Sequence, residues 1–279
     1  MVVDLHTHSD YSDGSDHPSR IVELAVAAHL TAVALTDHDG IDGNAEAVTA
    51  GEGRIEVIPG VELSVAWGDR AVHLLGYWIE PDTPIAELLA DIRGNRDERN
   101  RDMVAALVDL GIDITEDDIA IEGGRGSVGR PHIAAVLVQK GVVATIADAF
   151  DQYLAAGRPA YRGRLRLDLP EAVDLIHRSG GVAAVAHPHT IADRETEFLE
   201  LFELLTDLGV DGVECHYGEY APDLRDRLDR HARSLGLVPT GGSDYHGTYK
   251  PGLAVGTGRG DLRVPDTAVA ELRERRISG

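Results

Sequence analysis

The sequence contains a single cysteine, Cys215, and far fewer basic than acidic residues. One thiol cannot form an internal disulfide or a thiolate cluster, so any metal site must use imidazole and carboxylate ligands, which suit Zn, Mn or Fe. With 48 acidic and 26 basic residues the formal net charge is −22. Such a charge opposes electrostatic steering of long polyanions, and we therefore expect no duplex DNA partner.

Long apolar runs are also missing. No stretch approaches the roughly 20 apolar residues that a membrane span requires, and the N-terminus reaches Asp4 and His6 without the basic and apolar regions of a signal peptide. We therefore expect no membrane association and a cytoplasmic location. The rest of the composition, 43% hydrophobic and 27% charged residues in a chain of 279, is ordinary for a compact globular protein.

The first apolar run leads directly into a turn that is rich in histidine and aspartate. Residues two apart in a strand point to the same face, so His6 and His8 would direct two imidazoles at one point. Asp13 returns toward that point from the following loop. A surface strand could carry two histidines without binding anything, but this geometry favours a metal ion.

Downstream, apolar strands alternate with amphipathic helices. The patterns predict strands at 31–36, 55–58, 181–186, 212–215 and 238–241, and helices at 19–30, 44–50, 169–179, 195–208 and 221–235, with Ser19 as the first N-cap. Residues 63–77 form two extended runs with Gly68 and Asp69 in the turn between them, which predicts a hairpin. Polar residues gather at the strand ends, a pattern typical of an α/β barrel with its active site on the C-terminal face.

Residues 84–165 interrupt this rhythm and are mostly helical, with helices expected at 85–110, 115–120 and 131–140. The glycine-rich turn at 123–132 places Arg130 and His132 at a helix start, a position suited to phosphate. Both side chains could instead only cap the helix. Arg99 lies beside Arg96 and Arg101, and this group could simply solvate a helix face.

Nine residues are candidate metal ligands because they recur at one end of successive strands. They are His6, His8, Asp13, His38, Glu62, His73, His187, Asp244 and His246. One ion takes about four to six ligands, so nine imply two or three ions. Beside the expected site, His189 and His216 are either supporting residues or proton donors, and Tyr161 and Lys250 could reach the pocket.

These motifs resemble those of the PHP (polymerase and histidinol phosphatase) superfamily over nearly the whole chain. The resemblance rests on His6-x-His8 with Asp13, Thr36-Asp37-His38, Pro59-Gly60-Val61-Glu62, His73, Ala186-His187-Pro188 and Ser243-Asp244-x-His246. Gly129-Arg130-Pro131-His132 and the helical insertion resemble the branch that includes 3′,5′-nucleoside bisphosphate phosphatases and a 5′-to-3′ exoribonuclease.

The resemblance implies a distorted (β/α)7 barrel formed by 1–83 and 166–279, with 84–165 as a mostly helical insertion that forms a cap over the C-terminal face. It also implies three divalent metal ions, Mn, Fe or Zn. The implied ligands are His6, His8, Glu62 and Asp244 for one ion, Glu62, His73 and His187 for a second, and Asp13, His38 and His246 for the third. Some relatives carry histidine where this chain has Asp13.

The implied reaction is hydrolysis of a phosphate monoester by a water activated between two ions that share Glu62. Glu62 and Asp244 would be catalytic through these ions, and His216, His189 or a metal-bound water would protonate the leaving oxygen. Arg99, Arg130 and His132 would bind the substrate, a small phosphorylated molecule for which a nucleoside 3′,5′-bisphosphate is preferred. The alternatives are 5′-to-3′ trimming of short RNA, a histidinol phosphatase, and a non-catalytic metal-dependent binding module, which nine intact ligand types disfavour.

Overall fold

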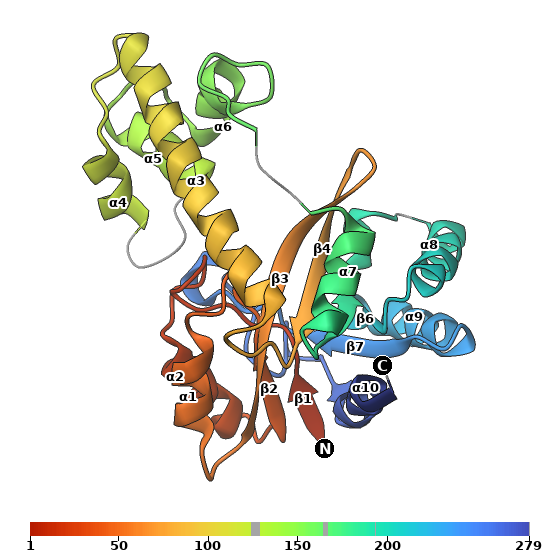
Figure 1. Cartoon of the computed structure of the whole chain (residues 1–279). Coiled ribbons are helices and arrows are strands. Elements are labelled where there is room, and N and C mark those ends of the chain that lie inside the picture. The colour runs from red at the N-terminus through yellow and green to blue at the C-terminus, as the bar shows by residue number, and fades with distance from the viewer. Residues whose placement is uncertain (124–128, 164–166, 193, 279) are drawn as a thin grey trace. The chain divides into compact units, whose positions relative to one another are not determined.

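The computed structural model describes residues 1–123, 129–163, 167–192 and 194–278 (Figure 1). The chain divides into two compact units, one formed by Met1–Leu88 with Arg166–Gly279 and the other by Leu89–Leu165. We call them unit 1 and unit 2. The sequence placed the first domain boundary between residues 83 and 84, whereas the first unit here extends to Leu88. The second expected boundary, between residues 165 and 166, lies outside the described residues. Within the described ranges, no helix is both long and apolar enough to cross a membrane.

Unit 1 contains one mixed sheet with the strand order β7-β6-β5-β4-β3-β2-β1-β8. The strands are β1 (Val2–Asp4), β2 (Ala32–Leu35), β3 (Glu56–Trp67), β4 (Arg70–Tyr77), β5 (Val182–Val185), β6 (Gly212–Tyr217), β7 (Val238–Gly242) and β8 (Val264–Pro265). Strands β1 to β3 are parallel, as are β5 to β7, whereas β4 is antiparallel to both neighbours and β8 to β1. The distorted α/β barrel is confirmed, with β8 as a short strand that the sequence pattern did not reveal.

The alternation of side chains along β2 shows how the barrel is filled. Ala32 and Ala34 lie in the same buried cluster as Tyr77, inside the sheet, whereas Val33 and Leu35 pack with Ile21 on the outer side. The helices of unit 1 are α1 (Pro18–Ala27), α2 (Asn44–Gly51), α7 (Leu169–Arg178), α8 (Glu195–Asp207), α9 (Pro222–Ser234) and α10 (Thr267–Ser278). The small residues of β2 therefore face the interior of the barrel, and its larger residues face α1 and α2.

Two local expectations need correction. The N-cap of α1 is His17 rather than Ser19, because the His17 imidazole accepts from the Ser19 backbone N–H and Pro18 occupies the first helical position. Strand β3 does not end at residue 58 but continues to Trp67, since it pairs with β2 and then with β4. The hairpin with its turn at Gly68 and Asp69 is confirmed.

The sheet closes because the chain after β1 remains extended and bonds to the end of β7. The Leu5 backbone N–H donates to the Gly241 carbonyl at 3.0 Å, and the Asp244 N–H donates to the His6 carbonyl at 2.9 Å. On the other side, the Thr36 N–H donates to the Thr7 carbonyl at 2.9 Å. Residues 5–8 thus lie between two neighbouring segments and continue β1 beyond its last ladder pair.

Unit 2 is helical and has its own core. Its elements are α3 (Pro84–Asp109), which begins in unit 1, α4 (Glu116–Gly123), α5 (Arg130–Gln139), α6 (Ile146–Ala149) and the π-helical turn η1 (Phe150–Leu154). Leu107, Ile119, Ile133 and Leu154 are among the buried residues that join these elements. The three helices expected from the sequence are confirmed within a few residues, whereas α6 and η1 were not expected.

The seam between β1 and β7 generates a stability prediction. A Cβ at Gly242 would lie 2.4 Å from the His6 Cβ and 2.5 Å from the His6 backbone nitrogen. We expect Gly242→Ala to lower the free energy of unfolding by about 1–3 kcal/mol, because the seam must separate to accept the methyl group. Gly94→Ala is the control, since a Cβ at Gly94 in α3 meets nothing within 4 Å. Urea denaturation of both variants checks the prediction, and an unchanged midpoint for Gly242→Ala would contradict it.

Candidate metal centre

The first pair of candidate ligands meets as the sequence pattern predicted. The Nε2 atoms of His6 and His8 lie 3.0 Å apart, and they lie 3.3 and 3.1 Å from Oε2 of Glu62. Both histidines follow the end of β1 rather than lying within it. The two-residue spacing still holds because the closing seam keeps residues 5–8 extended between their neighbours.

Glu62 is the residue around which the other side chains are arranged. Its side chain is 1% exposed, and its Oε1 lies 2.8 Å from His73 Nδ1 and 3.0 Å from His187 Nε2. His38 Nδ1 lies 3.2 Å from Oε2. Five histidines therefore surround one buried carboxylate when His6 and His8 are included. A carboxylate with two oxygens facing different imidazoles is suited to bridge two cations.

Asp13 and His246 complete the outer part of the cluster. His246 Nε2 lies 3.2 Å from Asp13 Oδ1, and His38 Nε2 lies 3.6 Å from Asp13 Oδ2. Asp13 is half exposed, in contrast to the buried His8 and Glu62. Solvent therefore reaches the cluster at Asp13, and also at His73, whose side chain is 33% exposed.

All nine candidate ligands fall into four overlapping groups in which the potential ligand atoms lie within 4.8 Å of one another. The groups are His8, Asp13, His38 and His246; His6, Glu62 and His187; His6, His8 and Asp244; and His38, Glu62 and His73. The structure thus brings together every residue of the expected ligand list. Imidazole and carboxylate donors without thiolate fit Zn, Mn or Fe.

A tenth residue, Glu214, was not identified from the sequence. Its side chain is fully buried; Oε1 accepts from His6 Nδ1 at 3.0 Å and Oε2 accepts from the His187 backbone N–H at 2.7 Å. A proton held on Nδ1 leaves the Nε2 lone pair of His6 directed at the cluster, which is the arrangement seen for metal-binding histidines. The chemistry of the donors therefore fits a cation. The only signal in the sequence was a charged residue inside an apolar strand.

Two further buried aspartates hold the backbone of the cluster. Asp37 accepts from the Ser9 N–H at 2.7 Å and from the Ser9 and Ser12 hydroxyls, which shapes the turn that carries Asp13. Asp4 accepts from the backbone N–H groups of Ser243 and Gly256 at 2.9 and 2.7 Å. Burial raises the pKa of each aspartate, and the hydrogen bonds oppose that shift.

The electrostatics of the cluster favour protonated histidine beside ionised carboxylate when no cation is bound. Burial lowers the pKa of His8, but hydrogen bonds to Asp244 and Glu62 outweigh burial and raise that pKa to about 10. Burial raises the pKa of Glu62, but His38, His6 and His73 hold it well below its ordinary value. His38 differs, because burial lowers its pKa to about 4 despite the attraction of Glu62.

Asp244 uses its two oxygens differently. Its Oδ1 lies 3.4 Å from His8 and 3.3 Å from His246, whereas its Oδ2 accepts from the Tyr217 hydroxyl at 2.7 Å and from Lys250 Nζ at 2.5 Å. Asp244 and His187 also have positive φ angles of 53° and 26°. Such backbone costs free energy for residues other than glycine and is held by the surrounding structure.

The two other histidines expected beside the site lie differently from each other. His216 directs Nε2 to Asp229 of α9 at 3.0 Å and belongs to none of the four ligand groups. A β-bulge between Glu214 and His216 shifts the alternation, so Tyr217 rather than His216 contacts the cluster. The role of His216 as proton donor stays a prediction, and its partner in the structure is Asp229. His189 contacts the His187 ring at a centroid distance of 5.9 Å and bonds through Nδ1 to Tyr220.

The expected substrate-binding residues lie in unit 2 and have contacts within it. The Arg130 guanidinium lies 5.9 Å from the Phe150 ring centroid and 5.6 Å from that of Tyr161. His132 accepts from the Gly129 backbone N–H through Nδ1 at 3.0 Å, which caps α5, and Arg99 donates to Asn100 at 3.1 Å. The glycine-rich segment 124–128 lies outside the described residues. A structural contribution of Arg130 and His132 is thus present, and their substrate contacts stay a prediction.

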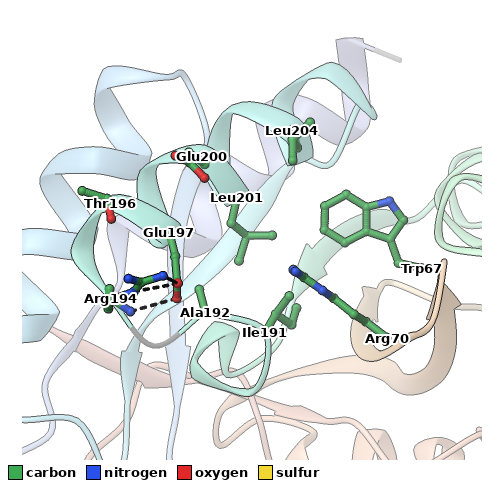
Figure 2. A pocket seen from close by; sticks show the side chains of 10 residues that line it. All are labelled: Trp67, Arg70, Ile191, Ala192, Arg194, Thr196, Glu197, Glu200, Leu201 and Leu204. Carbon is green, nitrogen blue, oxygen red and sulfur yellow. Dashed lines mark hydrogen bonds and ion pairs between the residues drawn. The ribbon is translucent and has the colours of Figure 1, made fainter.

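A separate cavity of about 520 Å³ lies between the tip of the β3–β4 hairpin and α8 (Figure 2). Trp67 and Arg70 line it from the hairpin, and Leu201 and Leu204 line it from α8. Trp67 pairs with Arg70 across the hairpin, and the cluster residue His73 pairs with Ser64. Ser64 and Trp67 are three residues apart along β3. An odd spacing places side chains on opposite faces of a strand, so this cavity lies outside the barrel and does not belong to the cluster.

Comparison with known proteins gives relatives over most of the chain. A 3′,5′-nucleoside bisphosphate phosphatase of Chromobacterium violaceum is 36% identical over 257 residues, which cover 91% of this chain and 90% of that protein. A 5′-3′ exoribonuclease of Haemophilus influenzae is 35% identical over 245 residues, covering 87% of this chain and 89% of that protein.

Two solved structures are similar over nearly their full length. One, from Bifidobacterium adolescentis and assigned as a metal-dependent phosphoesterase, has a TM-score of 0.78 and 32% identity, covering 98% of this chain and 96% of the other. The second, an amidohydrolase from Chromobacterium violaceum with bound sulfate and no metal, has a TM-score of 0.77 and 34% identity, covering 99% and 97%. The model of the PHP domain matches residues 4–240. Together with the clustered His, Asp and Glu side chains, these matches show that the chain belongs to the PHP domain family.

Proposed function

We propose that this protein is a metal-dependent phosphoesterase that hydrolyses a phosphate monoester of a nucleoside 3′,5′-bisphosphate. The observation that carries the proposal is the convergence of nine nitrogen and oxygen donors at the barrel, in a chain that is 36% identical to a 3′,5′-nucleoside bisphosphate phosphatase over 90% of that protein. Relatives named as a 5′-3′ exoribonuclease and as a phosphoribosyl 1,2-cyclic phosphate 1,2-diphosphodiesterase support the same reaction class, hydrolysis of a phosphate ester.

Divalent cations bound at this cluster would supply Lewis-acid polarisation of the phosphate and would lower the pKa of a water molecule. We propose three such ions, of Mn, Fe or Zn, with the nine residues as ligands. Glu62 would face two of them, because its two oxygens contact different histidines. Asp244 would present Oδ1 to the ions while Tyr217 holds Oδ2. Burial of Glu62 and His8 excludes bulk water from the inner part of the cluster.

The substrate's second anionic group requires cations beyond the cluster. We propose Arg99, Arg130 and His132 for this role, supported by the position of Arg130 and His132 in the first turn of α5, where backbone N–H groups favour anions. The Tyr161 and Phe150 rings beside Arg130 would orient its guanidinium. His216, His189 or a metal-bound water would protonate the leaving oxygen, and the contact of His189 with the His187 ring supports His189.

A second candidate function is 5′-to-3′ trimming of short RNA. It is supported by the 35% identity to an exoribonuclease over 89% of that protein. The net charge of −22 opposes binding of long RNA through electrostatics alone, but it does not oppose an oligonucleotide whose terminal phosphate is held at cations. Both candidates use the same cluster and differ in what must bind beside it.

The assay that tests the proposal measures phosphate release by the Mn-reconstituted protein on three substrates. These are adenosine 3′,5′-bisphosphate, histidinol phosphate and a 5′-phosphorylated oligoribonucleotide. We expect the highest kcat/KM on the bisphosphate. No turnover of any substrate by protein that demonstrably holds metal would overturn the hydrolase proposal and would favour a binding module.

The same assay applied to variants tests the role of the cluster. We expect His8→Ala to reduce kcat by more than about 10³-fold, since His8 belongs to two of the four ligand groups. The matched control is His29→Asn, because His29 is an exposed histidine with positive φ, which asparagine tolerates. Activity of His8→Ala close to that of the control would exclude the cluster as the reaction site.

Metal binding should release protons. The pKa of His8 lies at about 10 in the metal-free fold, so at pH 7.5 a cation must displace a proton from the cluster. We expect Mn²⁺ titration to be more exothermic in Tris than in PIPES. The buffer takes up the released protons in both titrations, and protonation of Tris releases more heat than protonation of PIPES. Equal enthalpies in the two buffers would contradict the protonated state of the metal-free cluster.

The same linkage sets a pH dependence of stability. A raised folded-state pKa of His8 stabilises the metal-free protein fully below its ordinary pKa of 6.5, and this contribution is lost as the pH rises toward 10. We therefore expect the increase in Tm caused by Mn²⁺ to be larger at pH 8.5 than at pH 6.5. Differential scanning calorimetry at both pH values measures it, and the opposite order would refute the prediction.

Glu214 should tune the affinity for metal without being a ligand. Each oxygen of Glu214 accepts one hydrogen bond, from His6 Nδ1 and from the His187 N–H, and in Glu214→Gln an NH₂ group replaces one of these oxygens. One of the two hydrogen bonds is then lost, so either the His6 ring or the His187 backbone is no longer held in place. We expect about 10- to 100-fold weaker metal binding, measured by competition with a chelating dye. Glu219→Gln, at an exposed glutamate that pairs with Arg259, is the control. Equal affinities of the two variants would show that Glu214 has no such role.

A further inference from the structure

Lysine is rare in this chain, and one of its lysines contacts the cluster. Of the 26 basic residues, two are lysines, Lys140 and Lys250, and the others are arginines. Lys140 ends α5 and pairs with Asp118 at 2.7 Å, in unit 2. Lys250 instead donates to Oδ2 of Asp244, a residue whose Oδ1 faces His6, His8 and His246. The Asp244 carboxylate therefore lies between the Lys250 ammonium and the three histidines of the cluster.

Lys250 is not required to orient Asp244. The Tyr217 hydroxyl already donates to the same Oδ2 at 2.7 Å, and the Asp244 backbone N–H is bonded to the His6 carbonyl. An ammonium group carries three N–H donors, and the contact with Asp244 uses one of them. Two N–H donors of Lys250 thus remain beyond its contact with a carboxylate oxygen that Tyr217 also satisfies.

The position of Lys250 is open to solvent. Its side chain is 39% exposed, whereas that of Asp244 is 3% exposed, so this ion pair joins a solvent-accessible lysine to a buried carboxylate of the cluster. The preceding turn is anchored, because the Thr248 N–H donates to the Ser15 hydroxyl at 2.9 Å and the Ser15 N–H donates to the His246 carbonyl. The lysine thus follows an anchored turn that also carries a candidate ligand, His246.

We infer that Lys250 is a substrate-contacting residue whose ammonium binds an oxygen of the phosphate group held at the cluster. The inference rests on the proposed function for the identity of that group. A phosphate monoester carries close to two negative charges and the chain as a whole has a formal net charge of −22, so a cation beside the cluster offsets repulsion as well as donating a hydrogen bond. Lysine suits a mobile phosphate because it acts as a point charge without a fixed geometry.

The first test measures binding of inorganic phosphate to the Mn-loaded protein by isothermal titration calorimetry. We expect Lys250→Gln to raise the Kd for phosphate about tenfold or more, the loss of one charge-assisted hydrogen bond, while its affinity for Mn²⁺ changes less than about twofold. Lys250→Arg should recover part of the phosphate affinity. Lys140→Gln is the matched control and should bind phosphate as the parent does.

The second test uses the scarcity of lysine and does not depend on the Lys250 variants folding. In a Lys140→Arg background, Lys250 is the one lysine side chain, so its acylation by an amine-reactive reagent can be followed by mass spectrometry. We expect inorganic phosphate to protect Lys250 in the Mn-loaded protein. Labelling at the same rate with and without phosphate would overturn the inference.

Two other results would also overturn it. One is an unchanged phosphate Kd in Lys250→Gln, and the other is a loss of Mn²⁺ affinity as large as the loss of phosphate affinity, which would show that Lys250 only positions Asp244. The proposed function fails separately. Absence of turnover on the nucleoside bisphosphate, with phosphate binding still dependent on Lys250, would reject the substrate and leave the inference intact.

Discussion

Burial of the Glu62 carboxylate is the constraint on which the rest of unit 1 depends. A carboxylate removed from water costs several kcal/mol unless charged or hydrogen-bonding partners replace the solvent. Here the partners are imidazoles that arrive from four different parts of the chain, on the segment after β1, on the loop after β2, on β4 and after β5. Each must reach the same point, so the closure of the barrel and the arrangement of the cluster depend on each other.

Supporting carboxylates extend this arrangement outward. Glu214 connects the His6 ring with the His187 backbone, and Asp37 fixes the turn that presents Asp13. The cluster is therefore not a set of independent side chains on a scaffold. His6 and Asp244 have polar partners on the side away from the centre, Glu214 and Tyr217, which limits how far these two can move when a cation binds. A preorganised donor set of this kind supports catalysis by reducing the reorganisation needed during reaction.

The sequence predicted which donor side chains lie together, because parallel strands end at one edge of a sheet and polar residues after several apolar runs must then meet. It predicted less where geometry departs from regular alternation. The bulge before His216 turned that side chain to α9, and the strained backbone at His187 had no sequence signature. Glu62 was assigned to a strand end although it lies within the long strand β3. Glu214 could be recognised only with its partners in place, because a charge in an apolar strand has many explanations.

The order of the ligands along the chain has a consequence for folding. His8 and His246 belong to one ligand group, and nearly the whole chain lies between them. A cation that binds both would act as a cross-link that closes a very long loop, and by the chain-entropy estimate for such loops it would stabilise the fold by about 5 kcal/mol. In a protein whose one cysteine is buried and free, the cations would thus take the part that disulfides play in secreted domains. Loss of metal would then lower the free energy of unfolding as well as abolish the reaction.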